Sequence, residues 1–128
     1  MKVEKLAITS PDVANIIVPV ICSGAPNAVS TTAVCGITNY NTTLSTVGSA
    51  TVPTLADSTL TGQLRRFQMI ADSGHDAVLT PATAFQGGAT TITFADVGDT
   101  ALLMWNGAAW QVLELSNCAD GATAPVLA

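Results

Sequence analysis

The amino-acid sequence consists of short segments rich in β-branched residues, which glycine and proline interrupt at close intervals. Residues 31–61 are dominated by Thr, Ser, Val and Ala, with Gly36, Gly48 and Pro53 as interruptions. Turn signals about every 8–12 residues are typical of all-β sandwiches and barrels. Helical periodicity is hard to find anywhere in the chain. We therefore predict an all-β protein.

The clearest hairpin signal lies near the C-terminus. Apolar runs at residues 100–105 and 109–115 flank Asn106-Gly107. Asn-Gly tolerates the positive φ angles of a two-residue type I′ turn, which joins antiparallel strands. Residues 63–71 and 76–80 form a second pair of runs around a polar turn, so we predict a hairpin there as well.

The chain of 128 residues has the length of one domain, with or without an ordered arm. Residues 56–62 mark a boundary between a less regular and a more regular half. We divide the chain into a strand-rich N-terminal segment, residues 1–60, and an antiparallel β domain, residues 61–128. The predicted architecture is a β-sandwich or small barrel of short antiparallel hairpins, with an extended N-terminal arm.

Charge is sparse and predominantly negative. Charged residues make up 10% of the chain, hydrophobic residues 48%, and the formal net charge is −5. Such a surface is poorer in charge than that of a typical small soluble domain, so we expect the protein to associate with copies of itself or with another protein. Binding to nucleic acid or to an anionic membrane is disfavoured, because both depend on Lys and Arg. Arg65 and Arg66 are expected to be a solvated strand position and an ion-pair partner for an Asp.

Two strands near the C-terminus are apolar on both faces, as expected for a sheet that packs on its own core and on a second sheet or subunit. In residues 110–115, Trp110, Val112 and Glu114 are expected on one face. The candidate interface residues are Leu103, Trp105, Trp110 and Val112. The two tryptophans could instead form a platform for stacking on sugar rings, but packing is the favoured interpretation.

No constellation of residues predicts catalysis, a metal site or a cofactor. His75, the single histidine, lies in Asp72-Ser73-Gly74-His75, and a tight turn explains that sequence better than an active site does. Asp96 and Asp99 are likewise expected to cap a turn rather than to bind calcium.

The cysteines show no metal-binding spacing. Cys22 and Cys35 could form a disulfide and leave Cys118 unpaired, although buried thiols are the more frequent arrangement. Polar residues and Pro11 interrupt the N-terminal region where a signal peptide would be apolar, so we expect a chain that is made inside the cell and not processed. The longest apolar stretch, residues 16–22, is too short to cross a bilayer.

Within residues 62–115, an ordered set of segments resembles a β-rich module of tailed-bacteriophage virion proteins. The segments are Gly62-Gln63-Leu64, residues 74–81, Thr91-Ile92-Thr93-Phe94, Val97-Gly98-Asp99, Leu102-Leu103, and Trp105-Asn106-Gly107 with Trp110. The resemblance implies a structural protein without enzymatic activity, commonly a homotrimer that decorates the capsid or forms fibres.

The short acidic chain without coiled-coil heptads suits a capsid decoration (cement) protein on the outside of the head, made in the host cytoplasm. Its expected partners are further copies of itself and the major capsid protein. The alternatives are a tail-fibre or receptor- and carbohydrate-binding tip and, less favoured, a small hydrolase that uses His75.

The apolar N-terminal segment is the candidate for an arm that binds the capsid or a neighbouring subunit by strand addition. An ordinary first strand of the chain's own sheet explains it equally well. The residues proposed for the arm are Val13, Ile16, Ile17, Val18, Val20 and Ile21.

Overall fold

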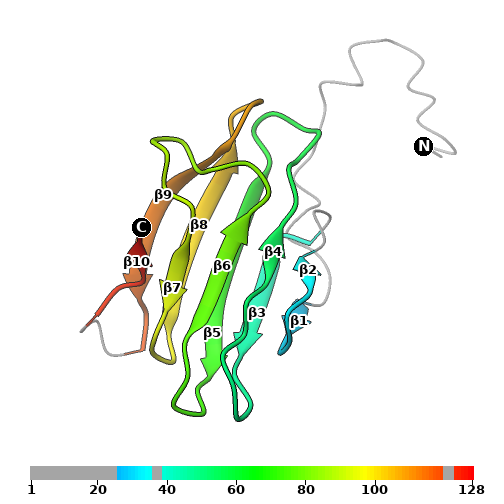
Figure 1. Cartoon of the computed structure of the whole chain (residues 1–128). Helices are drawn as coiled ribbons and strands as arrows, with labels where there is room; N and C mark the ends of the chain where they lie inside the picture. Colours follow the sequence, from blue (N-terminus) through cyan, green and yellow to red (C-terminus); the bar gives the residue numbers. More distant parts are fainter. Residues whose placement is uncertain (1–25, 36–38, 120–122) are drawn as a thin grey trace, which may run out of the picture.

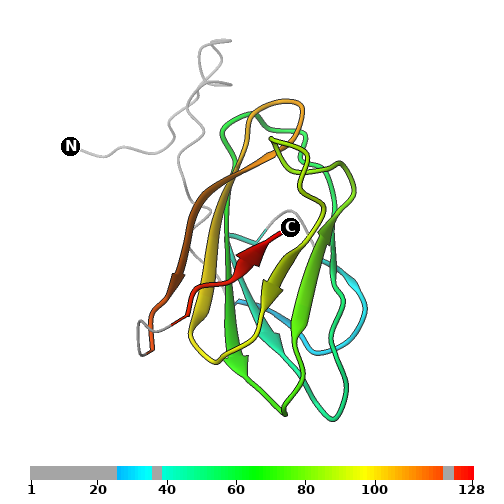
Figure 2. The same cartoon turned by 60° about the vertical axis from the view of Figure 1, so that its left-hand side comes forward.

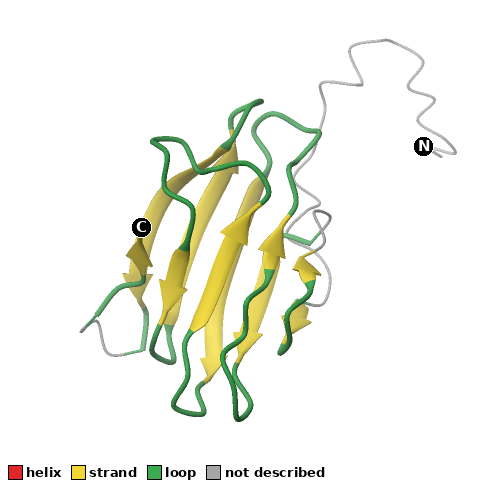
Figure 3. Cartoon of the chain, viewed as in Figure 1, coloured by secondary structure: helices red, strands yellow, loops and turns green. Residues whose placement is uncertain are grey.

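Ten β-strands, and no helix, make up the part of the chain that the structure describes (Figures 1 and 3). The structure is a computed structural model, and it describes residues 26–35, 39–119 and 123–128. The strands form two sheets that pack face to face as two layers (Figure 2). This confirms the prediction of an all-β sandwich, and the sheets do not close into a barrel. The predicted N-terminal arm lies outside the described residues.

The first sheet has five strands in the order β1-β3-β5-β8-β9. Its three longest strands are neighbours, and the short strand β1 forms one edge while β9 forms the other. The bounds are β1 Asn27–Val29, β3 Asn41–Ser45, β5 Leu64–Ala71, β8 Asp99–Trp105 and β9 Trp110–Asn117.

The second sheet also has five strands, in the order β10-β7-β6-β4-β2. Its strands are shorter, and its edges are the two-residue strands β10 and β2. The bounds are β2 Val34–Cys35, β4 Thr54–Leu55, β6 Ala77–Pro81, β7 Ile92–Phe94 and β10 Val126–Leu127.

The first six strands alternate between the two sheets, so neighbouring strands there run parallel. The predicted hairpin of residues 63–71 and 76–80 is therefore wrong, because β5 and β6 belong to different sheets. Both strands place alternate apolar residues on their inner sides, among them Phe67 on β5 and Leu79 on β6. These side chains contribute to one core between the layers, and residues 72–76 form the crossover between the sheets.

The hairpin of β8 and β9 is confirmed, but its turn differs from the predicted one. Trp105 pairs with Trp110, so the loop has four residues, 106–109, and not two. A type I′ turn needs positive φ at both central residues, whereas only Gly107 has it here, at 101°. The Asn106 side chain holds the loop instead, since its Oδ1 accepts hydrogen bonds from the backbone N–H groups of Ala108 and Ala109, each at 2.9 Å.

A bulge in β9 changes which side chains face the core. Leu103 pairs with Val112 and Leu102 pairs with Glu114, so Leu113 is an extra residue. The expectation that Trp110, Val112 and Glu114 share one face is therefore wrong for Glu114. The bulge lets the carboxylate face outward while Leu115, the next residue, packs against the core.

A charged side chain lies at the centre of this core. Arg65 on β5 has no exposed surface, contrary to the expected solvated position. Its Nη2 donates a hydrogen bond to Thr42 Oγ1 at 2.5 Å, and its guanidinium carbon lies 5.1 Å from the centroid of the Phe67 ring. Burial lowers the pKa of Arg65 and raises the pKa of the Cys35 thiol to about 11, although the nearby Arg65 charge opposes the rise at Cys35.

We predict that Thr42→Val lowers the free energy of unfolding by about 1–3 kcal/mol, because a buried charge loses a hydrogen-bond acceptor. Urea denaturation of Thr42→Val, Arg65→Met and the double variant measures the effect. In the Arg65→Met background the cost of Thr42→Val should largely disappear. An equal cost in both backgrounds would show that the hydrogen bond to Arg65 is not its source.

We also predict that Gly107→Val destabilises the fold by about 1 kcal/mol or more. A side chain at positive φ is strained, and a Cβ at this position would lie 3.1 Å from Thr61 Oγ1. Ala108→Val, in the same exposed loop but at negative φ, is the matched control and should change stability by less than about 0.5 kcal/mol. Equal melting temperatures for the two variants would contradict the prediction.

Candidate functional site

The structure places the predicted functional residues in different parts of the molecule. The six arm residues lie outside the described part of the chain, and so does Cys22. These arm residues are Val13, Ile16, Ile17, Val18, Val20 and Ile21. Among the described residues, Cys35 and Cys118 are free thiols, the first buried and the second exposed.

The four predicted interface residues lie inside the sandwich. Leu103 and Trp110 have no exposed surface, Trp105 is 5% exposed, and Val112 is partly buried against the core. The two indole rings meet edge to face with their centroids 5.4 Å apart, and Trp110 Nε1 donates a hydrogen bond to the Ala56 carbonyl. Leu103, Trp105 and Trp110 thus pack in the chain's own core and leave almost no ring surface for stacking on sugars, whereas Val112 keeps part of its surface exposed.

The predicted turn at His75 is present. Asp72 Oδ1 accepts hydrogen bonds from the N–H groups of Gly74 at 2.7 Å and His75 at 3.1 Å, and Gly74 has positive φ. The Ser73 hydroxyl contacts Thr46 Oγ1 at 3.3 Å and accepts a hydrogen bond from Gly48 N–H. Asp72, Ser73 and Gly74 thus hold the crossover between β5 and β6, as a tight turn requires.

The predicted turn at Asp96 and Asp99 is also present. Asp99 is buried, and its Oδ2 accepts hydrogen bonds from the N–H groups of Ala95 and Asp96 at 2.8 and 3.1 Å. Its Oδ1 accepts one from Asn117 Nδ2 at 3.0 Å. The described residues contain no cluster of three or more His, Cys, Asp or Glu side chains able to hold a metal ion.

The outward side of the first sheet is the candidate functional surface, and we call it the outer face. It consists of the side chains of β5, β8 and β9 that point away from the core. Cross-strand pairing places these side chains in register, because Arg66 pairs with Leu102 and Leu102 pairs with Glu114. The sequence predicted that β8 and β9 are apolar on both sides, but it did not show correctly which residues of β9 face outward.

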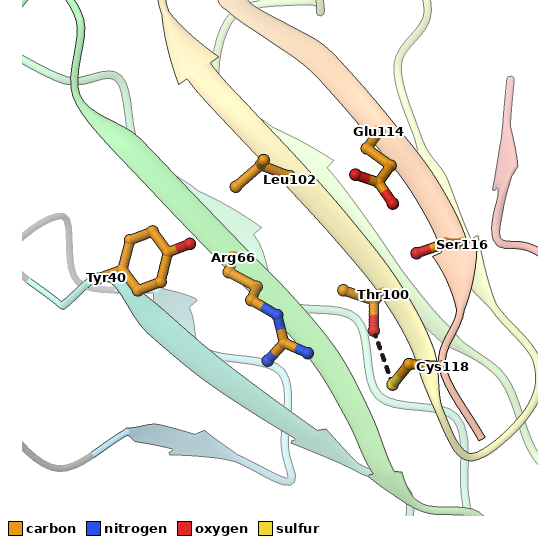
Figure 4. Close-up of a pocket in the computed structure, with 7 residues that line it drawn as sticks. All are labelled: Tyr40, Arg66, Thr100, Leu102, Glu114, Ser116 and Cys118. Atoms are coloured by element: carbon orange, nitrogen blue, oxygen red, sulfur yellow. Dashed lines mark hydrogen bonds between the residues drawn. The ribbon is translucent and has the colours of Figure 1, made fainter. Parts of the chain in front are cut away.

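A hollow of about 250 Å³ lies on the outer face around Arg66 (Figure 4). Arg66 Nη1 donates hydrogen bonds to Gln68 Oε1 at 2.9 Å and to Asn41 Oδ1 at 3.3 Å. Thr100 Oγ1 and Cys118 Sγ lie 3.5 Å apart at one end of the hollow. The lining residues come mainly from β5, β8 and β9, and they are Tyr40, Arg66, Thr100, Leu102, Glu114, Ser116 and Cys118.

Charge on the outer face is limited to one cation and one anion. The chain has four Lys and Arg residues, and of the two in the described part Arg65 is buried and Arg66 is half-buried. The described contacts of the Arg66 guanidinium are amide oxygens, not the Asp partner that was expected. The Glu114 carboxylate is exposed and forms no hydrogen bond or ion pair with a described residue.

Comparisons of the chain with protein-family models, with curated proteins and with solved structures found no match. In the described ranges, no helix is long and apolar enough to span a membrane. The geometry of the outer face and the sequence pattern are therefore the basis for a functional proposal.

We predict that Asp72→Ala destabilises the protein by about 1 kcal/mol, because two backbone N–H groups of the crossover turn lose their acceptor. His75→Ala should change stability by less than about 0.5 kcal/mol, since the imidazole is exposed. Thermal unfolding of the two variants tests the contrast. A hydrolytic activity that His75→Ala abolishes would overturn the interpretation of residues 72–75 as a turn without chemistry.

Proposed function

We propose that this protein is a structural component of a tailed-bacteriophage virion, a decoration protein that binds the outside of the assembled head as a homotrimer. The resemblance within residues 62–115 suggests this class of protein. The observation that carries the proposal is the outer face, a broad sheet surface with little charge. Its hollow of about 250 Å³ is smaller than the roughly 300–1,000 Å³ typical of small-molecule sites, so the face suits a protein surface better than a ligand.

Decoration would stabilise the head by state-specific binding. A protein that binds only the assembled and expanded shell shifts the equilibrium toward that state by mass action. Three linked subunits would strengthen attachment, because the second and third contacts form at high effective concentration. The partner in this proposal is the major capsid protein, and the location is the capsid exterior.

The N-terminal segment has a place in this proposal as a capsid- or subunit-binding arm. The described chain starts at Pro26, directly before β1, and β1 is a three-residue strand at the edge of the first sheet. Residues 13–21 thus precede a short edge strand. Strand addition to a sheet of the capsid protein or of a neighbouring subunit would satisfy the backbone of such an apolar segment.

We predict that the protein cosediments with undecorated, expanded phage heads and not with soluble capsid subunits. Contacts through an outer face with few charges should persist as salt rises, whereas exposed ionic contacts are screened within about 10 Å at 0.1 M ionic strength. The measurement is the amount of protein sedimented with heads across a salt series. Retention on host-surface polysaccharide without binding to heads would reject decoration in favour of a receptor-binding tip.

A further inference from the structure

The outer face carries one row of side chains with opposite charges at its two ends. Arg66 on β5, Leu102 on β8 and Glu114 on β9 are direct cross-strand neighbours, and all three project from the same side of the sheet (Figure 4). Neighbouring residues in antiparallel strands are about 4.5–5.5 Å apart between Cα atoms. The two charged residues are therefore separated by about 10 Å, with an apolar side chain between them.

Neither charge of this row is neutralised within the described chain. Glu114 forms no hydrogen bond or ion pair there, and Arg66 donates to the uncharged side chains of Asn41 and Gln68. The other exposed carboxylates of the described residues lie in loops and not on the outer face. They are Asp57, Asp72, Asp76 and Asp96. Among the described residues, the row thus has a positive and a negative group that no opposite charge faces.

We propose that the outer face binds the outer face of a second copy of this chain around a two-fold axis that runs parallel to the strands and passes over Leu102. Such an axis reverses the row from end to end. Arg66 of each copy then lies against Glu114 of the other, and the two Leu102 side chains meet at the centre. An in-plane axis perpendicular to the strands would instead place Arg66 against Arg66 and Glu114 against Glu114, which like-charge repulsion disfavours.

The cross-strand rows on either side of this one are also compatible with the same two-fold axis. Toward one end of β8, Met104 lies between Leu64 and Gln111, so the two Met104 side chains would meet as the Leu102 pair does. Toward the other end of β8, Thr100 pairs with Gln68 on one side and with Ser116 on the other. The Gln68 amide of each copy would then face the Ser116 hydroxyl of the other copy, and the two groups can form a hydrogen bond. Neither row contains a charge, so the Arg66 and Glu114 contacts decide the orientation of the two copies.

The size of the face sets the strength of this association. An axis over β8 superposes β5, β8 and β9 of the two copies, and three strands about 4.8 Å apart with at most eight residues at about 3.4 Å each give roughly 400 Å² in projection. Two copies together bury about 800 Å², which is below the size of most specific interfaces and in the range of weak, transient ones. The association should therefore be reversible and concentration-dependent.

Pairing uses the same outer face that the proposed function assigns to the capsid contact, so one copy cannot make both contacts at once. A single chain would become a dimer, and a homotrimer would become a hexamer. Sedimentation equilibrium of the full-length protein over a concentration series measures that doubling of mass. Binding to phage heads is a separate readout, so either proposal can fail while the other holds.

Charge reversal provides the decisive test. Arg66→Glu and Glu114→Arg each turn two attractive contacts of the pair into repulsive ones, and each should raise the dissociation constant of the doubling step at least about tenfold. The double variant Arg66→Glu/Glu114→Arg restores opposite charges and should return the constant to within about threefold of the wild-type value. Both side chains are on the surface, and circular dichroism of each variant verifies that the fold is retained.

Asp76→Arg is the matched control, since it makes the same change of charge as Glu114→Arg at an exposed loop position away from the outer face. It should leave the doubling step unchanged. The proposal is overturned if the wild-type protein shows no doubling of mass up to millimolar concentration. It is equally overturned if single charge reversals leave the step intact, or if the double variant associates as poorly as the single ones.

Discussion

Both sheets depend on strands β5 and β6 and on the turn that joins them. In the first sheet, β5 pairs in parallel with β3 and antiparallel with β8, and in the second sheet β6 pairs in parallel with β4 and antiparallel with β7. The change from parallel to antiparallel pairing thus occurs in both layers at two consecutive strands. The hydrogen bonds that Asp72 accepts fix the crossover between them, and with it the alignment of the two layers.

In the C-terminal half of the chain, the sequence predicted where the strands lie better than it predicted which strands pair with one another. Alternating apolar residues and turn signals located β5, β6, β8 and β9 to within a few residues, and the Asn106-Gly107 hairpin is present. Sheet membership could not be predicted for β5 and β6, because a turn with glycine serves a hairpin and a crossover equally well. The difference depends on long-range parallel pairing with β3 and β4, and short-range patterns do not report such contacts.

For the candidate site, the sequence predicted strands with two apolar sides but not the side that each residue occupies. Trp105 and Trp110 were predicted to lie at an interface, yet large rings stabilise a core most when they are fully buried. The outward position of Glu114 follows from the bulge at Leu113, which period-two alternation does not reveal. Arg65 and Arg66 are neighbours with the same chemistry, and only the register with β3 and β8 places one in the core and the other outside.

The alternation of the first six strands between layers has a consequence for the order of folding. Strands β8 and β9 are joined by four residues, whereas every parallel pair requires the chain to traverse the other sheet first. Local contacts form faster than distant ones, because closing a longer loop costs more conformational entropy. The hairpin is thus expected to form early and to serve as a template for β5, then β3 and finally β1. Growth of the first sheet would proceed from the C-terminal side toward the N-terminus, opposite to the direction of synthesis, so a nascent chain would expose its apolar strands until β8 and β9 have been made.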